Sequence, residues 1–114
     1  MADGERLICA STDLLDAGLA VRFSVERLGL VEPAFVVRYR GVAYAYLNRC
    51  GHVPVELDWQ EGHIFDLSSL YLTCATHGAL YSPESGRCLE GRCNGNGLTP
   101  LAIVERDGQI FLKE

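Results

Sequence analysis

The sequence lacks the features that mark membrane-spanning and nucleic-acid-binding proteins. No apolar run approaches the ~18 residues that a transmembrane helix needs. The ten Lys and Arg residues form no basic run and the formal net charge is −5, so the electrostatic footprint of a nucleic-acid-binding protein is missing. No phosphate-binding glycine loop, nucleophile–base pair or nucleotide-binding motif is present. We therefore expect a protein that contacts neither membrane nor nucleic acid.

The marks of a secreted protein are also missing. The first residues, MADGERLICA, carry acidic side chains and lack the basic-then-apolar pattern of a secretory signal. The five cysteines are an odd number, so a complete set of internal disulfides would leave one over. Both features favour a cytoplasmic location, where clustered Cys and His indicate a metal site before disulfides.

Length and composition fit one folded domain, residues 1–114. Hydrophobic residues make up 48% of the chain, which is enough to supply a core. Charged residues make up 22% and there is no long polar tract, which argues against disorder. We expect a monomer or a weak oligomer.

Short apolar stretches with Gly, Pro, Asn and Asp between them predict an all-β domain. The expected fold is an antiparallel β-sandwich or small barrel, with a segment at about 47–91 inserted to carry the chemistry. Arg40-Gly41 and Asp107-Gly108 predict tight turns, and 12–19 is the only candidate helix. Strands are expected at 21–26, 35–39, 42–47, 64–65, 70–72, 80–81, 87–89, 102–104 and 110–112, and around LICA near the N-terminus.

Two short motifs carry the chemistry, Cys50-Gly51-His52 and Cys74-Ala75-Thr76-His77. They follow the apolar stretches VAYAYLNR and LYLT, and rigid strands of this kind can hold two ligand loops face to face. Each motif adjoins a glycine, Gly51 or Gly78, that lets the backbone approach a ligand closely. Because Cys and His at this spacing are usually metal ligands, we predict a site built from Cys50, His52, Cys74 and His77.

Two other interpretations of these residues stay open. A lone Cys is most often a small buried side chain and a lone His an ordinary polar one, but two tight pairs make coincidence improbable. Zinc accepts two Cys and two His, although structural zinc sites usually take both Cys from one loop and both His from another. Here each loop supplies one of each, which suits a two-iron cluster in which each loop gives its Cys to one iron and its His to the other.

In these motifs the sequence resembles the Rieske family, whose signature is C-x-H, a spacer and then C-x-x-H. The resemblance includes AYAYLNRC, HGALYSPESGRCLEG and LTPLAIVERDGQIFL, and so covers most of Phe35 to Leu112. It implies a Rieske-type fold and one [2Fe–2S] cluster per chain. Carried over residue by residue, Cys50 and Cys74 would bind the inner iron, and His52 and His77 the outer iron.

The resemblance also separates branches of the family. High-potential respiratory members carry a disulfide between the two cluster loops, whose cysteines would fall at Val55 and Thr76. They place a Ser hydroxyl, which donates to a cluster sulfide, where this chain has Ala79. Tyr81 matches a tyrosine of that branch, and we weigh donation to a cysteine sulfur equally with simple ring packing. Without the Ser hydroxyl, we expect a low to intermediate potential within the family range of roughly −150 to +300 mV.

The function implied by the resemblance is electron transfer, as in the ferredoxin components of ring-hydroxylating dioxygenases. The protein would not itself be an enzyme but would carry one electron from a reductase to an oxygenase or another redox partner. An oxygenase would also need a mononuclear iron held by two His and a carboxylate, for which only His63 is spare. The alternative is a Rieske-fold subunit of a larger complex that is non-redox or binds zinc.

The remaining Cys, His and Trp residues are expected to be structural. Cys9 lies in the apolar LICA stretch and is predicted to be in the core. Cys88 and Cys93 flank LEGR and are predicted to be free thiols in a reducing compartment. His63 is predicted to lie on a surface loop, and Trp59 to pack under the first cluster loop.

Overall fold

The computed structural model describes residues 5–27, 29–49, 57, 62–66, 68–74, 78–91 and 97–113. Among them, the regular structure consists of strands and one short 3₁₀ helix, η1 (Ser11–Asp13). The strands are β1 (Glu5–Ala10), β2 (Val21–Arg27), β3 (Leu30–Tyr39), β4 (Val42–Leu47), β5 (Leu72–Thr73), β6 (Leu80–Tyr81), β7 (Cys88–Glu90), β8 (Pro100–Leu101), β9 (Ile103–Arg106) and β10 (Gln109–Lys113).

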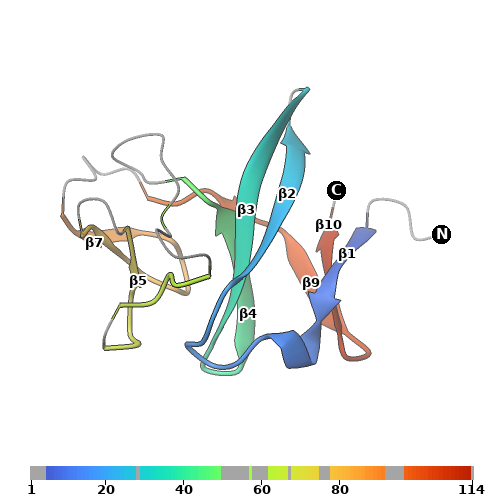
Figure 1. Cartoon of the computed structure of the whole chain (residues 1–114), viewed down its shortest axis with the longest axis horizontal. Coiled ribbons are helices and arrows are strands. Elements are labelled where there is room, and N and C mark those ends of the chain that lie inside the picture. The colour runs from blue at the N-terminus through green and yellow to red at the C-terminus, as the bar shows by residue number, and fades with distance from the viewer. Residues whose placement is uncertain are drawn as a thin grey trace.

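The strands form three sheets, in the orders β1-β10-β9, β2-β3-β4-β8 and β5-β6-β7. All of the strand pairings are antiparallel, which confirms the predicted all-β antiparallel architecture. In Figure 1 the β2-β3-β4-β8 sheet stands in the middle, with β1, β9 and β10 on one side and β5 and β7 on the other. Over the described residues the strands close into no barrel, so of the two predicted forms the sandwich is the one observed.

The middle sheet packs against another sheet on each of its two faces. Side chains alternate along its strands, so successive residues enter opposite cores. On β3, Phe35 and Val37 enter the core shared with β5 and β6, whereas Ala34 and Val36 face β1 and β10. All four side chains have no exposed area. This explains why VAYAYL, the sequence of β4, is apolar on both faces: Tyr46 packs in the core shared with β5 and β6, whereas Ala45 and Leu47 pack in two clusters on the other face.

The two predicted tight turns are confirmed by their backbone angles. Arg40 and Gly41 have φ of 51° and 82°, and Asp107 and Gly108 have φ of 52° and 72°. Positive φ at both central residues is the geometry of a type I′ hairpin turn, whose twist matches that of the flanking strands.

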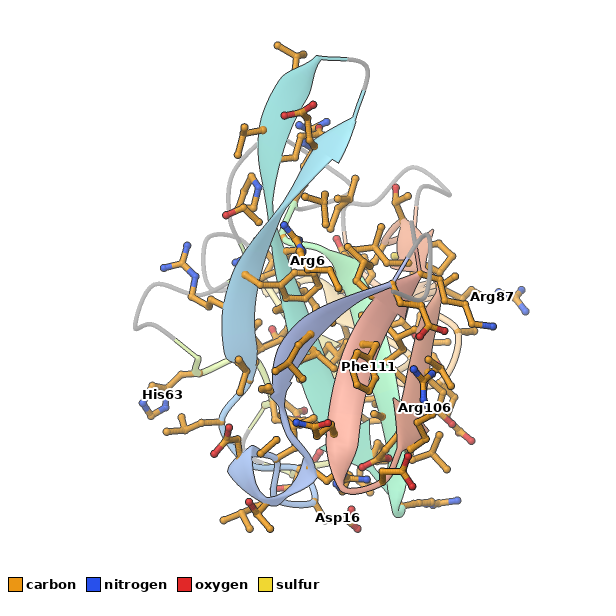
Figure 2. The ribbon with its side chains drawn as sticks, turned by 90° about the vertical axis from the view of Figure 1, so that its right-hand side faces the viewer. Arg6, Asp16, His63, Arg87, Arg106 and Phe111 are labelled. Atoms are coloured by element: carbon orange, nitrogen blue, oxygen red, sulfur yellow. The ribbon has the colours of Figure 1, made fainter. Side chains whose placement is uncertain are left out.

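The β2–β3 hairpin extends past the rest of its sheet. The pairing of β2 with β3 runs from Val21↔Val36 to Arg27↔Leu30, whereas β4 pairs with β3 only from Ala34 onward. Figure 2 shows this hairpin projecting beyond the other strands. Near its base, Glu32 of β3 forms an ion pair with Arg49 at 2.5 Å, just after the end of β4.

Arg38 of β3 joins the two sheets of the sandwich. Its guanidinium donates to both carboxylate oxygens of Glu105 on β9, at 3.1 and 2.6 Å. It also donates to the carbonyl oxygens of Leu14, Ser11 and Gly41. The hydrogen bond from Arg38 is the largest cause lowering the pKa of the Glu105 carboxyl. The pair therefore ties β3, η1 and β9 together.

Three sequence predictions are corrected here. The candidate helix at 12–19 is wrong: only Ser11–Asp13 forms a 3₁₀ turn, and Ala17 adopts a φ of 52° that interrupts a helix. The predicted strand at 35–39 begins earlier, at Leu30, because β2 continues to pair along it. The predicted strand at 64–65 is reduced to one bridge, Phe65↔Leu72. In the described part of the chain, no helix is long and apolar enough to cross a membrane.

Candidate [2Fe–2S] centre

Of the four predicted ligands, the structure describes Cys74. Cys50, His52 and His77 lie outside the described residues. The same holds for Trp59, Cys93, Val55 and Thr76, so the predictions made for them stay predictions.

Cys74 directly follows β5 and is completely buried. Its backbone N–H donates to the carbonyl oxygen of Ala79 at 3.0 Å, and its own carbonyl accepts the N–H of Gly78 at 2.8 Å. Gly78 has a φ of 72°, a conformation that costs glycine nothing and other residues strain. The backbone of Cys74 is thus bonded to both Gly78 and Ala79, and His77 lies between these residues in the sequence.

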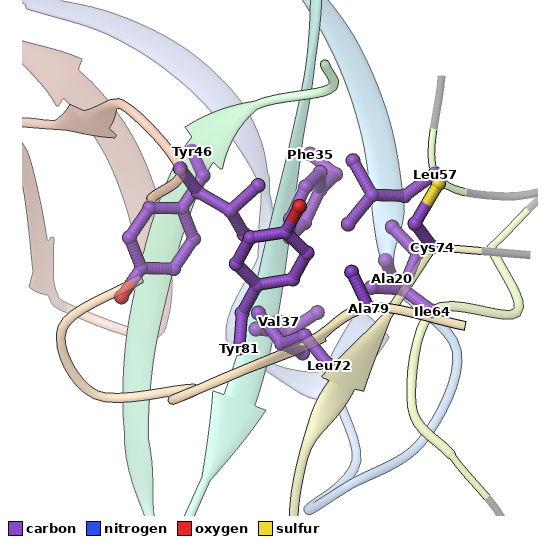
Figure 3. Close-up of a cluster of buried hydrophobic side chains, with 11 residues drawn as sticks. Ala20, Phe35, Val37, Tyr46, Leu57, Ile64, Leu72, Cys74, Ala79 and Tyr81 are labelled. Carbon is purple, nitrogen blue, oxygen red and sulfur yellow. The ribbon is translucent and has the colours of Figure 1, made fainter. Parts of the chain in front are cut away.

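Ala79 and Tyr81 share the buried face of the β5–β6 hairpin with Cys74. The register pairs Leu72 with Tyr81, and the backbone bond places Ala79 opposite Cys74. Because side chains alternate along a strand, these residues point to the same side. Figure 3 shows Cys74, Ala79 and Tyr81 within one apolar cluster, and none of the three has exposed area. The packing role predicted for the Tyr81 ring is confirmed; donation of its hydroxyl to a cysteine sulfur stays a prediction.

The hairpin is also packed closely from behind. A Cβ placed on Gly91, which follows β7, would lie 2.7 Å from the Cα and 3.1 Å from the Cβ of Ala79. Only glycine allows this approach, and its φ of 103° is likewise unfavourable for any other residue. Gly91 therefore backs the strand that holds Cys74 in place.

Comparison with known protein families identifies the family to which this chain belongs. The family model of the Rieske [2Fe-2S] domain matches residues 5–110. The chain belongs to the Rieske family. Its cofactor is accordingly a [2Fe–2S] cluster. A comparison with curated proteins found no match.

Solved structures of ferredoxins and of a terminal oxygenase share the fold. The ferredoxin of carbazole 1,9a-dioxygenase from Nocardioides aromaticivorans IC177 has a TM-score of 0.74 at 20% identity, over 97% of this chain and 98% of that one. A ferredoxin from Sphingomonas yanoikuyae B1 has a TM-score of 0.70 at 17% identity, over 96% and 98%. The terminal oxygenase of carbazole 1,9a-dioxygenase from Novosphingobium sp. KA1 has a TM-score of 0.74 at 23% identity, but only 30% of its length is covered.

The described part of this Rieske domain fits a cluster ligand at Cys74. A thiolate is the ligand that iron–sulfur clusters require, and Cys74 offers one from an apolar, water-excluded core. Among the described residues, no three His, Cys, Asp or Glu side chains gather into a possible metal site.

Tyr46 of β4 contacts the segment that follows β6 in this Rieske domain. The Tyr46 hydroxyl donates to the carbonyl oxygen of Pro83 at 2.8 Å in the core, and burial is the largest cause raising its pKa. Gly86 lies against the Tyr46 ring, where a Cβ would approach the ring to 2.7 Å. The turn predicted from SPESG is thus confirmed and is anchored to β4 by one side chain.

Sequence reasoning missed Asn48, the one polar or charged side chain that is buried among the described residues. It follows β4 and precedes Cys50 by two positions. A polar residue directly after a strand that is apolar on both faces was the available signal.

The predictions for the other Cys and His residues have mixed outcomes. Cys9 is buried in the sandwich core, and burial raises the pKa of its thiol. His63 is exposed, as predicted. The prediction of a free thiol at Cys88 is wrong, because Cys88 is disulfide-bonded. That prediction assumed a reducing compartment and did not consider exposure. Cys88 is only partly buried, so its sulfur is accessible to a second cysteine.

Proposed function

We propose that this Rieske protein is a one-electron carrier whose cluster is bound by Cys50, His52, Cys74 and His77. Cys50 and Cys74 hold the inner iron, and His52 and His77 the outer iron. When bound, the cluster supplies a site that accepts and releases one electron. Residues 1–114 form one domain in this proposal, with a cluster-binding subdomain at about 47–91. The proposed location of the protein is the cytoplasm.

The observation that carries the proposal is Cys74, which is buried and whose backbone is bonded to Gly78 and Ala79. The chain that contains it matches the Rieske family over residues 5–110. The fold shared with two solved ferredoxins supports the carrier proposal. Another solved structure that shares the fold is a complex of reduced oxygenase and oxidized ferredoxin.

The chain's own residues define what the site does. The apolar cluster around Cys74 excludes water from the inner side of the site, and the β5–β6 backbone bonds fix the cysteine before an electron arrives. The histidine side is the proposed docking surface for a reductase and then for an oxygenase-type acceptor. Electron-transfer complexes are small, below about 1,200 Å², so a transient contact suffices.

Metal and sulfide analysis of anaerobically purified protein tests the proposal. We expect about two irons and two acid-labile sulfides per chain, with a visible spectrum that bleaches on reduction with dithionite. Replacing any of the four ligands by Ala should abolish that spectrum, whereas the matched variant Cys9→Ala should keep it, because Cys9 lies in the other core. A colourless protein with about one zinc and no sulfide, even after reconstitution, would instead support the structural zinc alternative.

A further inference from the structure

Asn48 makes two hydrogen bonds that join the end of β4 to distant parts of the chain. Its side-chain Oδ1 accepts the backbone N–H of Leu57 at 2.8 Å. Its backbone N–H donates to the carbonyl oxygen of Pro33, on β3, also at 2.8 Å. The residue is 1% exposed, so neither bond competes with water. Polar groups buried in this way are retained where their hydrogen bonds are made.

The far partner, Leu57, is itself anchored. Its side chain has no exposed area and packs in the same apolar cluster as Cys74 (Figure 3). The hydrogen bond from its N–H to Asn48 therefore joins the two residues that flank 49–56 in the sequence, one held on β3 through Pro33 and the other packed in this core. Cys50 and His52 lie within that span of the sequence.

The second motif is closed in a different way. There the backbone of Cys74 itself makes both bonds, with Gly78 and with Ala79. In the first motif the closing acceptor is a side chain, so it can be removed by substitution without altering the main chain. Closing the loop during folding lowers the entropy cost of bringing its ligands together when the cluster binds.

We infer that Asn48 is a positioning residue for the cluster, which holds the ends of the first ligand loop through its Oδ1. The inference rests on the proposed assignment of Cys50 and His52 as ligands. Asn48 acts through Leu57 and Pro33 and is not itself a ligand.

The test compares cluster release from four proteins: wild type, Asn48→Leu, Asn48→Asp and Leu112→Ala. Leucine has nearly the size of asparagine but no acceptor, and aspartate keeps an acceptor oxygen. Leu112 lies in the other core, between the β2-β3-β4-β8 and β1-β10-β9 sheets, so its truncation controls for lost stability alone. The readouts are the decay of visible absorbance in an iron chelator, the EPR spectrum of the reduced cluster, and hydrogen exchange at the Leu57 amide.

We expect Asn48→Leu to lose its cluster ~10-fold faster than wild type, the ratio that corresponds to one unsatisfied buried N–H. Its Leu57 amide should exchange faster and its EPR spectrum should shift. Asn48→Asp should release its cluster more slowly than Asn48→Leu, because its oxygen still accepts the Leu57 N–H. Leu112→Ala, with a thermal midpoint similar to that of Asn48→Leu, should keep the wild-type release rate. If Asn48→Leu does not fold, Asn48→Ala, which leaves room for a water, takes its place.

Cluster release from Asn48→Leu at the wild-type rate, or no faster than from Leu112→Ala, would overturn the inference while leaving the carrier function intact. A wild-type protein that holds no iron and no sulfide would overturn the proposed function, and the inference with it. The two failures are distinguished by the wild-type sample alone.

Discussion

Replacing Gly91 by alanine should damage the β5–β6 hairpin, which holds the predicted ligand Cys74, more than any ordinary glycine substitution. The new Cβ would lie 2.7 Å from the Ala79 Cα, and the normal carbon–carbon separation begins at about 3.5 Å, so the backbone has to move by about 0.8 Å. The Ala79 carbonyl accepts the N–H of Cys74, so that movement is transmitted directly to the predicted ligand.

The control is Gly108→Ala in the β9–β10 turn. Gly108 also has a positive φ, 72°, but a Cβ there would meet nothing within 4 Å. Both variants incur the left-handed backbone cost of about 1–2 kcal/mol. Gly91→Ala adds a packing clash of about 1–3 kcal/mol. The difference between the two variants therefore reports the contact with Ala79 together with the larger φ of Gly91, 103° against 72°.

Urea unfolding followed by circular dichroism measures both free energies of unfolding, and visible absorbance reports the cluster. In thermal scans the extra loss in Gly91→Ala should appear as a lower midpoint, about 4 °C for each kcal/mol. Cluster loss should accelerate in Gly91→Ala and stay at the wild-type rate in Gly108→Ala. Equal destabilisation of the two variants, with an equally stable cluster, would refute the argument that Gly91 supports the Cys74 hairpin.

Three further predictions concern electrostatics and redox chemistry. Glu105→Gln should lower the free energy of unfolding at pH 7 by about 0.5–1 kcal/mol. This deficit should vanish toward pH 3, because Arg38 lowers the pKa of Glu105 and the stabilisation is lost as the folded carboxylate protonates. A deficit in urea unfolding that is constant with pH would contradict this. Ala79→Ser should raise the midpoint potential, since a hydroxyl on this buried face would donate to cluster sulfur; an unchanged potential with the cluster intact would show that Ala79 does not face the cluster. Cys88→Ser should keep the cluster spectrum and lose stability only under oxidising conditions, because Cys88 is disulfide-bonded; loss of the spectrum would overturn the ligand assignment.

The parts of the fold that local chemistry determines were predictable from the sequence. Alternating apolar and polar residues identified β2, a continuous apolar run identified β4, and Asp107-Gly108 identified the last hairpin. The sequence analysis missed the start of β3, which pairs there with β2 alone; Pro33 is tolerated because it lies outside the region where β3 pairs with β4. The helix expected at 12–19 failed because tertiary bonds from Arg38 to Leu14 and Ser11 favoured an extended path.

The candidate site was only partly predictable, for a similar reason. Ligand spacing identifies chemistry, and Cys74 lies at the end of a buried strand as the motif requires. The residues that support it act through long-range contacts: Gly91 against Ala79, Asn48 with Leu57, and Tyr46 with Pro83. No local pattern in the sequence specifies these partners.

The most direct test of the central claim is an equilibrium redox titration of the purified protein, monitored by visible absorbance and EPR. A Rieske electron carrier of the ferredoxin type should take up one electron per chain, with a midpoint between about −150 and +200 mV. A protein with no reducible centre in that window, or with a midpoint well above +200 mV, would contradict the account.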